Sequence, residues 1–349
     1  MSKLLIEIEG KMTKNAIELN NLTKKFGDFT AVDDLSLAVE EGEIFGFLGP
    51  NGAGKSTTIR MLCTLAQPTS GSARVAGFDL IKESDQVRQN IGLVAEKMIM
   101  YDRLTAAENL RFFGKLYSMP KQKLEERIDE LLELVDMQEW KNTQISKFST
   151  GMKQRINVIR ALLPEPEILF MDEPTLGLDP QTTFSIRDIT REINQSGMTI
   201  ILTTHAMTEA EVLSDRVAII DHGKIAALDT PQNLKNMISH GDITVFGIKI
   251  DNLTRELIEK IRSLEMVTAV AQQDDYNLKV SARGDDALNQ IIDTIRGEGG
   301  DIASLTNSNE STLEDVFLAV TGKQMRDQAT EKPVNTHHGH GPAPKARGR

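Results

Sequence analysis

The first stretch that could do chemistry is a glycine-rich run, Gly49-Pro50-Asn51-Gly52-Ala53-Gly54-Lys55-Ser56-Thr57. It fits the pattern G-x-x-x-x-G-K-S of a phosphate-binding loop. Its glycines let the backbone approach a phosphate closely, and its amides join the start of the next helix as an anion site. Lys55 adds a positive charge for the β- and γ-phosphates, and Ser56 offers a hydroxyl to Mg²⁺. The apolar run before the loop and the helix-prone run after it argue against an ordinary glycine-rich turn.

Two carboxylates end a second buried strand. Residues 168–171 are all apolar, as in a parallel strand buried on both faces, and Asp172 and Glu173 follow directly. Asp172 is placed to hold Mg²⁺, directly or through water, while Glu173 polarises a water molecule. The alternative, an acidic pair that only caps the next turn, is weaker because the whole run before it is apolar. His205 follows a later strand, at the sheet edge where ligands bind.

Composition narrows the class of protein. The chain has 349 residues, which allows one to three domains, and 40% of them are hydrophobic, enough for sizeable cores. The net charge of −11 argues against a nucleic-acid partner. The single cysteine, Cys63, excludes an internal disulfide. Without a run of 18 apolar residues, and with Glu7 and Glu9 in the N-terminal apolar patch, we expect a cytoplasmic protein without a signal peptide.

The order of the expected elements gives an α/β domain and a smaller second unit. After a lead at 1–14, an α/β domain with the phosphate-binding loop spans 15–238, with a helical insertion at about 96–163 in which Pro120 separates two helices. Residues 24–28 are expected to form a turn. The order βαββαβ over 241–322 predicts an α+β ferredoxin-like domain, closed by a helix with a capping box at Ser311-Thr312-Leu313-Glu314. The polar tail at 323–349, with its histidines, is expected to be disordered.

Five motifs together resemble a known family. The runs 49–57, 148–155, 168–174 and 176–179 and the histidine at 205 are similar, in order and spacing over residues 16–235, to the ATP-binding cassette (ABC) ATPases of membrane transporters. The run 311–322 resembles the branch that powers drug and lipid exporters of the daunorubicin-resistance type. The resemblance implies a P-loop NTPase cassette, two copies of which pair head to tail around two ATP molecules with Mg²⁺.

The resemblance also implies roles for single residues. Glu173 and His205 are expected to be catalytic, and Ser149, Gly151 and Asp179 to reach the ATP of the other copy. The metal ligands are expected to be Ser56, Glu96 and Asp172. Nucleotide is expected to be bound by the residues Phe26, Gly49, Pro50, Asn51, Gly52, Ala53, Gly54, Lys55, Ser56 and Thr57.

Three positions depart from the family pattern. The signature, usually Leu-Ser-Gly-Gly-Gln, is here Phe148-Ser149-Thr150-Gly151-Met152, which keeps the serine and the second glycine. Glu96 stands where the family commonly has glutamine, and a carboxylate is a good ligand for a hard cation. Phe26 replaces the commoner tyrosine; it is expected either to stack on adenine or to pack on its own strand.

We therefore expect the ATP-hydrolysing subunit of an exporter, a homodimer that meets the membrane only through a separate multi-span permease. A soluble cassette ATPase acting on ribosomes or DNA is a second class, disfavoured by the single cassette, the lack of heptads and the acidic charge. A nucleotide-binding regulator that does not hydrolyse ATP is a third. The presence of both Glu173 and His205 argues against it.

Overall fold

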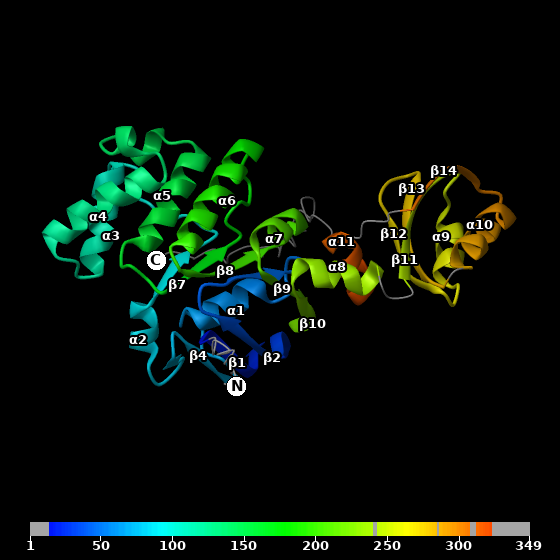
Figure 1. The fold of residues 1–349 in the computed structure, drawn as a ribbon, viewed down its shortest axis with the longest axis horizontal. Coiled ribbons are helices and arrows are strands. Elements are labelled where there is room, and N and C mark those ends of the chain that lie inside the picture. Colours follow the sequence, from blue (N-terminus) through cyan, green and yellow to red (C-terminus); the bar gives the residue numbers. More distant parts are fainter. Residues whose placement is uncertain (1–13, 240–242, 285, 308–311, 323–349) are drawn as a thin grey trace, which may run out of the picture.

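The computed structural model describes residues 14–239, 243–284, 286–307 and 312–322. Of the expected lead only Lys14 is described, and the tail at 323–349 lies outside the described residues. Figure 1 shows a helical region at one end of the molecule, a sheet region in the middle, and a separate small sheet with two helices at the other end. No helix among the described residues is long and apolar enough to cross a membrane.

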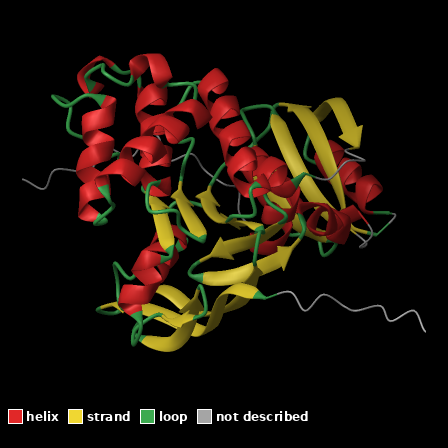
Figure 2. Ribbon diagram, turned by 60° about the vertical axis from the view of Figure 1, so that its left-hand side comes forward, coloured by secondary structure: helices red, strands yellow, loops and turns green. Residues whose placement is uncertain are grey.

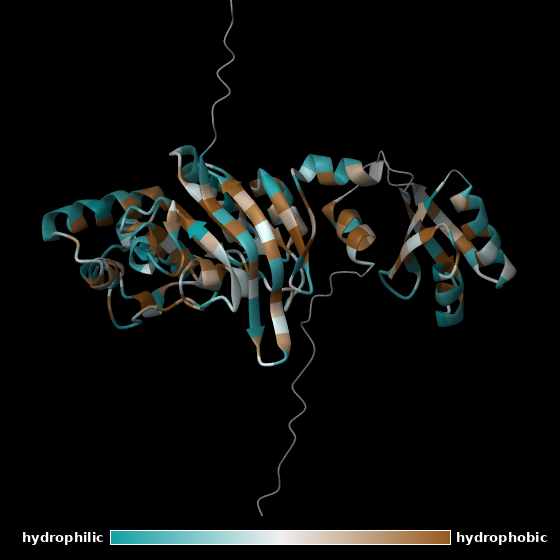
Figure 3. Cartoon of the chain, turned by 90° about the horizontal axis from the view of Figure 1, so that it is seen from below, coloured by the Kyte–Doolittle hydropathy of each residue, from teal (hydrophilic) through white to brown (hydrophobic). Residues whose placement is uncertain are grey.

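An antiparallel sheet forms one layer of the middle region. Its strand order is β2-β1-β4-β5, and its bounds are β1 (Asn15–Phe26), β2 (Phe29–Glu40), β4 (Ser70–Val75) and β5 (Phe78–Asp79). Bands of hydrophobic and hydrophilic residues alternate along the long strands, as expected where one face is buried (Figure 3). The prediction of a turn at 24–28 is wrong in its length. Phe26 pairs with Phe29, so the turn contains only Gly27 and Asp28.

A mostly parallel sheet forms the next layer, with strand order β10-β9-β3-β8-β7-β6. Every residue of β3, β7 and β8 is buried, as expected for parallel strands covered on both faces, and the polar residues of β7 and β8 lie at the strand ends. Only the β9–β10 hairpin is antiparallel. The bounds are β3 (Ile44–Leu48), β6 (Ile91–Val94), β7 (Ile168–Asp172), β8 (Thr199–Thr204), β9 (Arg216–Asp221) and β10 (Lys224–Asp229).

Helices cover both faces of the parallel sheet (Figure 2). Helix α1 (Lys55–Leu62) lies between the two sheets, and its Ile59 shares a core with Ile17 and Phe170. The other face packs against a second core, to which Leu110 and Ile128 belong. The helices around that core include α3 (Ala106–Leu116), α4 (Lys121–Leu134), α5 (Thr150–Leu162) and α6 (Pro180–Gln195). Pro120 is the N-cap of α4, so it separates α3 from α4 as expected. The shorter helices are α2 (Ser84–Gln89), α7 (Met207–Leu213), α8 (Pro231–Ser239) and two 3₁₀ turns, Gln138–Trp140 and Ile145–Lys147.

The C-terminal unit is a four-stranded antiparallel sheet with order β12-β13-β11-β14 and two helices. Its elements follow the chain as β11 (Ile243–Asp251), α9 (Arg255–Arg262), β12 (Val267–Gln272), β13 (Asn277–Arg283), α10 (Ala287–Gly297) and β14 (Asp301–Asn307). This is the βαββαβ order of a split βαβ unit. The inward faces of α9 and α10 supply Leu257, Ile261, Ile291 and Ile295 to its core.

The last helix, α11 (Leu313–Thr321), returns to the ATPase region and packs on α8 and α7. Its Val316 and Phe317 share a core with Leu48 of β3 and Ile219 of β9. The capping box lies one residue later than expected. The Thr312 hydroxyl accepts from the Asp315 amide at 3.3 Å, and the Asp315 carboxylate accepts from the Thr312 amide at 2.9 Å. Thr312 and Asp315 have the same three-residue spacing as the predicted pair, and it is Asp315, 0% exposed, rather than the half-buried Glu314 that reaches back to the cap.

Because α11 completes the core around the phosphate-loop strand, we expect Phe317→Ala to destabilise the ATPase region. Phe317 is 1% exposed, and a buried Phe→Ala change costs about 3–5 kcal/mol of unfolding free energy. Chemical denaturation measures this loss. Val320→Ala, on the same helix but 37% exposed, is the control and should change stability by about 0.5 kcal/mol or less. Equal effects of the two changes would show that α11 does not contribute to this core.

Candidate nucleotide site

The glycine-rich loop joins β3 to α1 and encloses a lysine. Gly54 is the N-cap of α1 with a φ of 110°, and a Cβ there would lie 2.5 Å from the Ala31 carbonyl oxygen, so only glycine fits. Lys55 is 4% exposed. Its Nζ donates to the carbonyl oxygens of Gly49 at 2.7 Å and Pro50 at 3.3 Å. The loop therefore holds a buried cation at the carboxyl end of β3.

Two carboxylates, at the end of β7 and directly after it, lie beside this loop. The Ser56 hydroxyl donates to Asp172 Oδ1 at 2.9 Å, and the Thr203 hydroxyl of β8 donates to the same oxygen at 2.5 Å. Glu173 has a φ of 48°, the left-handed region, and its amide donates to the Thr203 carbonyl oxygen at 3.1 Å. Thr203 thus fixes both acidic residues. Thr203 was not predicted as a site residue, although it follows the apolar residues of β8 directly.

Glu173 is the centre of the site. It is 8% exposed, its Oε1 lies 3.2 Å from Lys55 Nζ, and its Oε2 lies 2.8 Å from His205 Nδ1. These side chains come from the carboxyl ends of β3, β7 and β8, which are neighbours in the sheet. The structure therefore brings together the expected residues Lys55, Ser56, Asp172, Glu173 and His205. Such a set can bind phosphate, hold a cation through hydroxyl and carboxylate oxygens, and activate water.

The residues expected to act on a second copy lie apart from this centre and are linked to each other. Ser149 is the exposed N-cap of α5, and its hydroxyl accepts from the Met152 amide at 3.2 Å. A Cβ on Gly151 would lie 2.6 Å from Thr182 Cγ2, so glycine allows α5 to approach α6 closely. Asp179 caps α6 and accepts from the Thr182 amide and hydroxyl at 3.0 and 2.6 Å. These hydrogen bonds from Thr182 lower the pKa of the Asp179 carboxyl.

Two expected residues are not in contact with the centre. Glu96 lies two residues beyond β6, on the same sheet edge, but it is exposed. In the described part of the chain no hydrogen bond or ion pair joins it to Ser56 or Asp172. Phe26 is 53% exposed at the end of β1, where Lys24 Nζ lies 5.0 Å from its ring centroid. Both positions remain predictions.

Sequence reasoning also missed Gln154. This side chain of α5 is 5% exposed and donates to the Pro174 carbonyl oxygen at 2.7 Å. It ties α5 to the loop that follows Glu173. The sequence shows only a glutamine inside the run 148–155, and its burial and its partner are visible in the structure alone.

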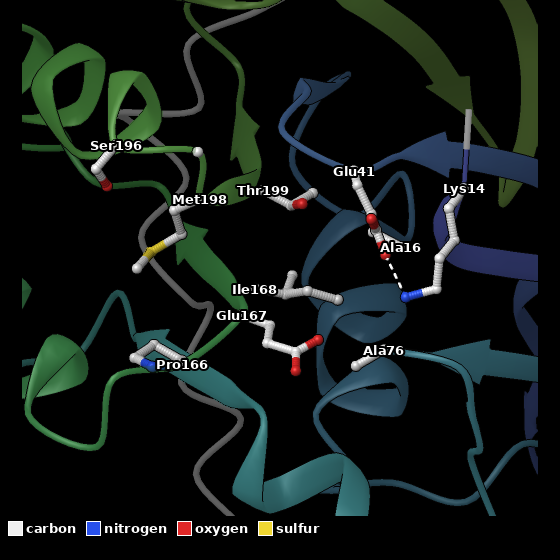
Figure 4. Close-up of a pocket in the computed structure, with 11 residues that line it drawn as sticks. Lys14, Ala16, Glu41, Ala76, Pro166, Glu167, Ile168, Ser196, Met198 and Thr199 are labelled. Atoms are coloured by element: carbon white, nitrogen blue, oxygen red, sulfur yellow. Dashed lines mark ion pairs between the residues drawn. The ribbon is translucent and has the colours of Figure 1, made fainter. Parts of the chain in front are cut away.

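A separate pocket of about 420 Å³ lies at the opposite edge of the parallel sheet, where β7 and β8 begin (Figure 4). Its lining includes Ile168, Thr199 and the Lys14–Glu41 ion pair, whose Nζ and Oε1 atoms are 2.6 Å apart. It has neither a glycine-rich loop nor a helix N-terminus. The amino ends of parallel strands do not form the ligand site of such sheets, so the loop side remains the candidate.

A wider groove of about 1140 Å³ runs from the phosphate loop to the C-terminal unit. One wall is Pro50–Ala53 with His222, and the other includes Arg255 and Arg262 of α9. The C-terminal unit therefore lies next to the outer side of the loop.

A glycine-rich loop between a buried strand and a helix, with a strand-end Asp-Glu pair and a histidine, defines a P-loop ATPase. Comparisons with known proteins agree. The family model "ABC transporter" matches residues 32–176. The chain is 37% identical over 314 residues to the linearmycin resistance ATP-binding protein LnrL of Bacillus subtilis, covering 89% of this chain and 100% of that one. It is 35% identical to the daunorubicin/doxorubicin resistance ATP-binding protein DrrA of Streptomyces peucetius, covering 91% and 96%.

A solved structure supports the same assignment. It is a dimeric ATP-binding cassette in a post-hydrolysis state with ADP and Pi, 27% identical, with a TM-score of 0.56. The match covers 61% of this chain and 98% of the chain in that structure. The chain belongs to the ABC transporter family, as one of its ATP-hydrolysing cassettes.

Cys63, directly after α1, gives a test of the packing behind the loop. It is 4% exposed, and burial, helped by the negative charge of Asp172, raises the pKa of its thiol. Since the thiolate is the reactive form, we expect the folded chain to resist iodoacetamide at pH 8. Mass spectrometry should find one modified thiol per chain only after denaturation. Rapid labelling of the native protein would mean that α1 is not packed between the sheets.

Proposed function

We propose that this chain powers the export of an organic compound through a separate multi-span membrane permease, by hydrolysing ATP in a dimer of cassettes. The observation that carries the proposal is the cluster of buried Lys55 and Glu173 with half-buried His205, beside the Ser56–Asp172 hydrogen bond. Support for export comes from the relatives, which are named for resistance to linearmycin and to daunorubicin. The chain would lie on the cytoplasmic side of the membrane and touch it only through the permease.

Nucleotide binding would exchange one charge partner of Lys55 for another. In the structure the lysine is neutralised by Glu173 at 3.2 Å. A phosphate on the loop amides of residues 49–57 would attract Lys55 through a stronger charge and release the Glu173 carboxylate. The exposed ring of Phe26 would then stack on the adenine.

The residues around Ser56 fit a magnesium ion. A hydroxyl and a carboxylate oxygen lie 2.9 Å apart there, and hard oxygen ligands of this kind suit Mg²⁺. Ser56 and Asp172 would hold it, and Glu96 would join from the next strand end. When bound, the ion neutralises charge on the β- and γ-phosphates. Thr203 keeps Asp172 aligned for this role.

Hydrolysis would then depend on Glu173 and His205. The Glu173 carboxylate, freed from Lys55, orients the attacking water and takes up its proton. His205 contacts the γ-phosphate, and its bond to Glu173 through Nδ1 fixes the ring. Ser149 at the start of α5 and Asp179 at the start of α6 would complete the site from a second copy, which makes the dimer the catalytic unit.

The partner would dock on the helical region. An aromatic patch, formed by Tyr101, Phe112 and Phe113, contains two edge-on ring contacts with centroids 4.8 and 5.4 Å apart. Tyr101 is 45% and Phe112 38% exposed, and Ile99 beside them is 61% exposed. Exposed aromatic side chains that gather in this way are typical of protein interfaces. The patch follows Glu96 in the chain, so a permease bound there could sense the metal side of the site.

Glu173→Gln tests the catalytic assignment. The amide keeps the shape but cannot accept the proton, so we expect turnover to fall by about 10²–10⁴-fold while ATP binding persists. ATPase assays measure turnover, calorimetry measures binding, and size-exclusion chromatography should show an ATP-dependent dimer. Glu167→Gln, an exposed change at the other edge of the same sheet, is the control. Near-normal turnover of the Glu173 variant would refute the role.

A second prediction concerns the role of Glu96 in binding the metal. Glu96→Gln still offers an oxygen but loses a charge, so it should keep most ATPase activity and need more Mg²⁺ for half-maximal rate. Glu96→Ala should lose more activity, including its stimulation by the permease. A magnesium titration of the three proteins side by side decides this. If the three curves coincide, Glu96 only faces solvent.

A further inference from the structure

One buried acidic side chain has no place in the mechanism described so far. Glu209 lies on α7, four residues after His205, and is 0% exposed. Neither of its carboxylate oxygens has a hydrogen-bond partner in the described residues. Full burial without a partner is unfavourable for a carboxylate, so the presence of Glu209 here indicates a specific role.

The surroundings of Glu209 come from the segments that carry the catalytic residues. Burial raises the pKa of its carboxyl group, and the negative charge of Glu173 adds to the rise. The hydroxyls of Thr204 and Thr175 and the positive charge of Arg187 act in the opposite direction. The two hydroxyls therefore lie beside the carboxyl group, although neither completes a well-formed hydrogen bond.

Both threonines sit on short chain segments next to the catalytic side chains. Thr204 ends β8 directly before His205, its carbonyl oxygen accepts from the Gly49 amide at 3.3 Å, and its hydroxyl accepts from the Ala206 amide at 2.9 Å. Thr175 lies two residues after Glu173, and its carbonyl oxygen accepts from the Leu178 amide at 3.2 Å. The carboxyl group of Glu209, on which both threonines act, therefore lies beside both catalytic segments.

The third neighbour links this place to the expected dimer face. Arg187 lies two turns into α6, the helix that Asp179 caps. Its Nε is buried and has no hydrogen-bond partner among the described residues, while its guanidinium lies 5.9 Å from the Phe184 ring. Helices α6 and α7 pack against each other, so a buried donor without an acceptor and a buried carboxylate without a donor lie on neighbouring helices, and the charge of Arg187 acts on Glu209.

We propose that Glu209 is a positioning residue for ATP hydrolysis: its carboxyl group holds the segments of Glu173 and His205 at their working distance, with Arg187 as its charge partner. The inference rests on the proposed roles of Glu173 and His205. Because Arg187 shares a helix with Asp179, a movement of α6 when two cassettes meet would change the Arg187–Glu209 contact. Dimer formation would in this way change the positions of Glu173 and His205.

The test uses the full-length chain with Mg-ATP. Glu209→Gln removes the charge and keeps the shape, and Arg187→Met removes the partner. For each we expect kcat to fall by about 10- to 100-fold, the cost of a small misplacement of catalytic groups, with KM and calorimetric ATP affinity unchanged. The double variant should be no slower than the worse single variant, because the two side chains act as one unit.

Glu211→Gln is the matched control. Glu211 lies on the same helix but forms a half-buried ion pair with Lys235 of α8 at 2.5 Å, away from the catalytic segments, so the kcat of this variant should equal that of the unaltered chain. A wild-type kcat for Glu209→Gln would overturn the proposal. So would losses of kcat, ATP affinity and thermal stability that run in parallel, because they would show only a packing role. Glu173→Gln in the same assay separates the two claims: if that variant still turns over, the proposed catalytic assignment fails and the inference with it.

Discussion

The buried ion pair between Lys55 and Glu173 is the constraint on which the rest of the site depends. Both side chains are less than a tenth exposed, and their charged atoms lie 3.2 Å apart. A single buried charge without a partner is strongly unfavourable, so neither residue is tolerable without the other or a substitute for it. A phosphate with its metal is such a substitute. The candidate nucleotide site is therefore already charged and largely desolvated, and under the proposed function nucleotide binding would exchange one partner of Lys55 for another.

The parallel sheet is what makes this pair possible. Its strand order places β8 between β3 and β7, so that Lys55, Glu173 and His205 approach one another from three adjacent strand ends. Thr203 on the middle strand holds Asp172 by its hydroxyl and Glu173 by its backbone. Helices α5, α6 and α7 then connect this edge with the surface. Gln154 reaches the loop after Glu173 from α5, and Arg187 and Glu209 lie on α6 and α7. In the proposed mechanism, a rearrangement of these helices would affect the chemistry through a few polar side chains.

The sequence predicted the parts of the site whose chemistry is local. A glycine-rich loop or an apolar run ending in Asp-Glu can be recognised in one stretch, and parallel strand ends necessarily share an edge. The sequence could not predict Thr203, Thr182 or Glu209, because their importance lies in partners that are distant along the chain. The same holds for α11: its capping box predicted a helix, but not that the apolar face of this helix covers β3 and β9. Phe26 and Glu96 belong to a third kind: the structure shows where they lie, but a role for them requires the nucleotide.

The most direct test of this account is a double-mutant cycle on the Lys55–Glu173 pair in the nucleotide-free protein, measured by chemical denaturation. Lys55→Met and Glu173→Gln each leave one buried charge unpaired, so each should lower the unfolding free energy by about 3–5 kcal/mol. The double variant removes both charges and should lose less than the sum of the single losses, by at least about 1 kcal/mol. Single losses that add to within about 0.5 kcal/mol would contradict the account, because they would show that the two charges do not depend on each other.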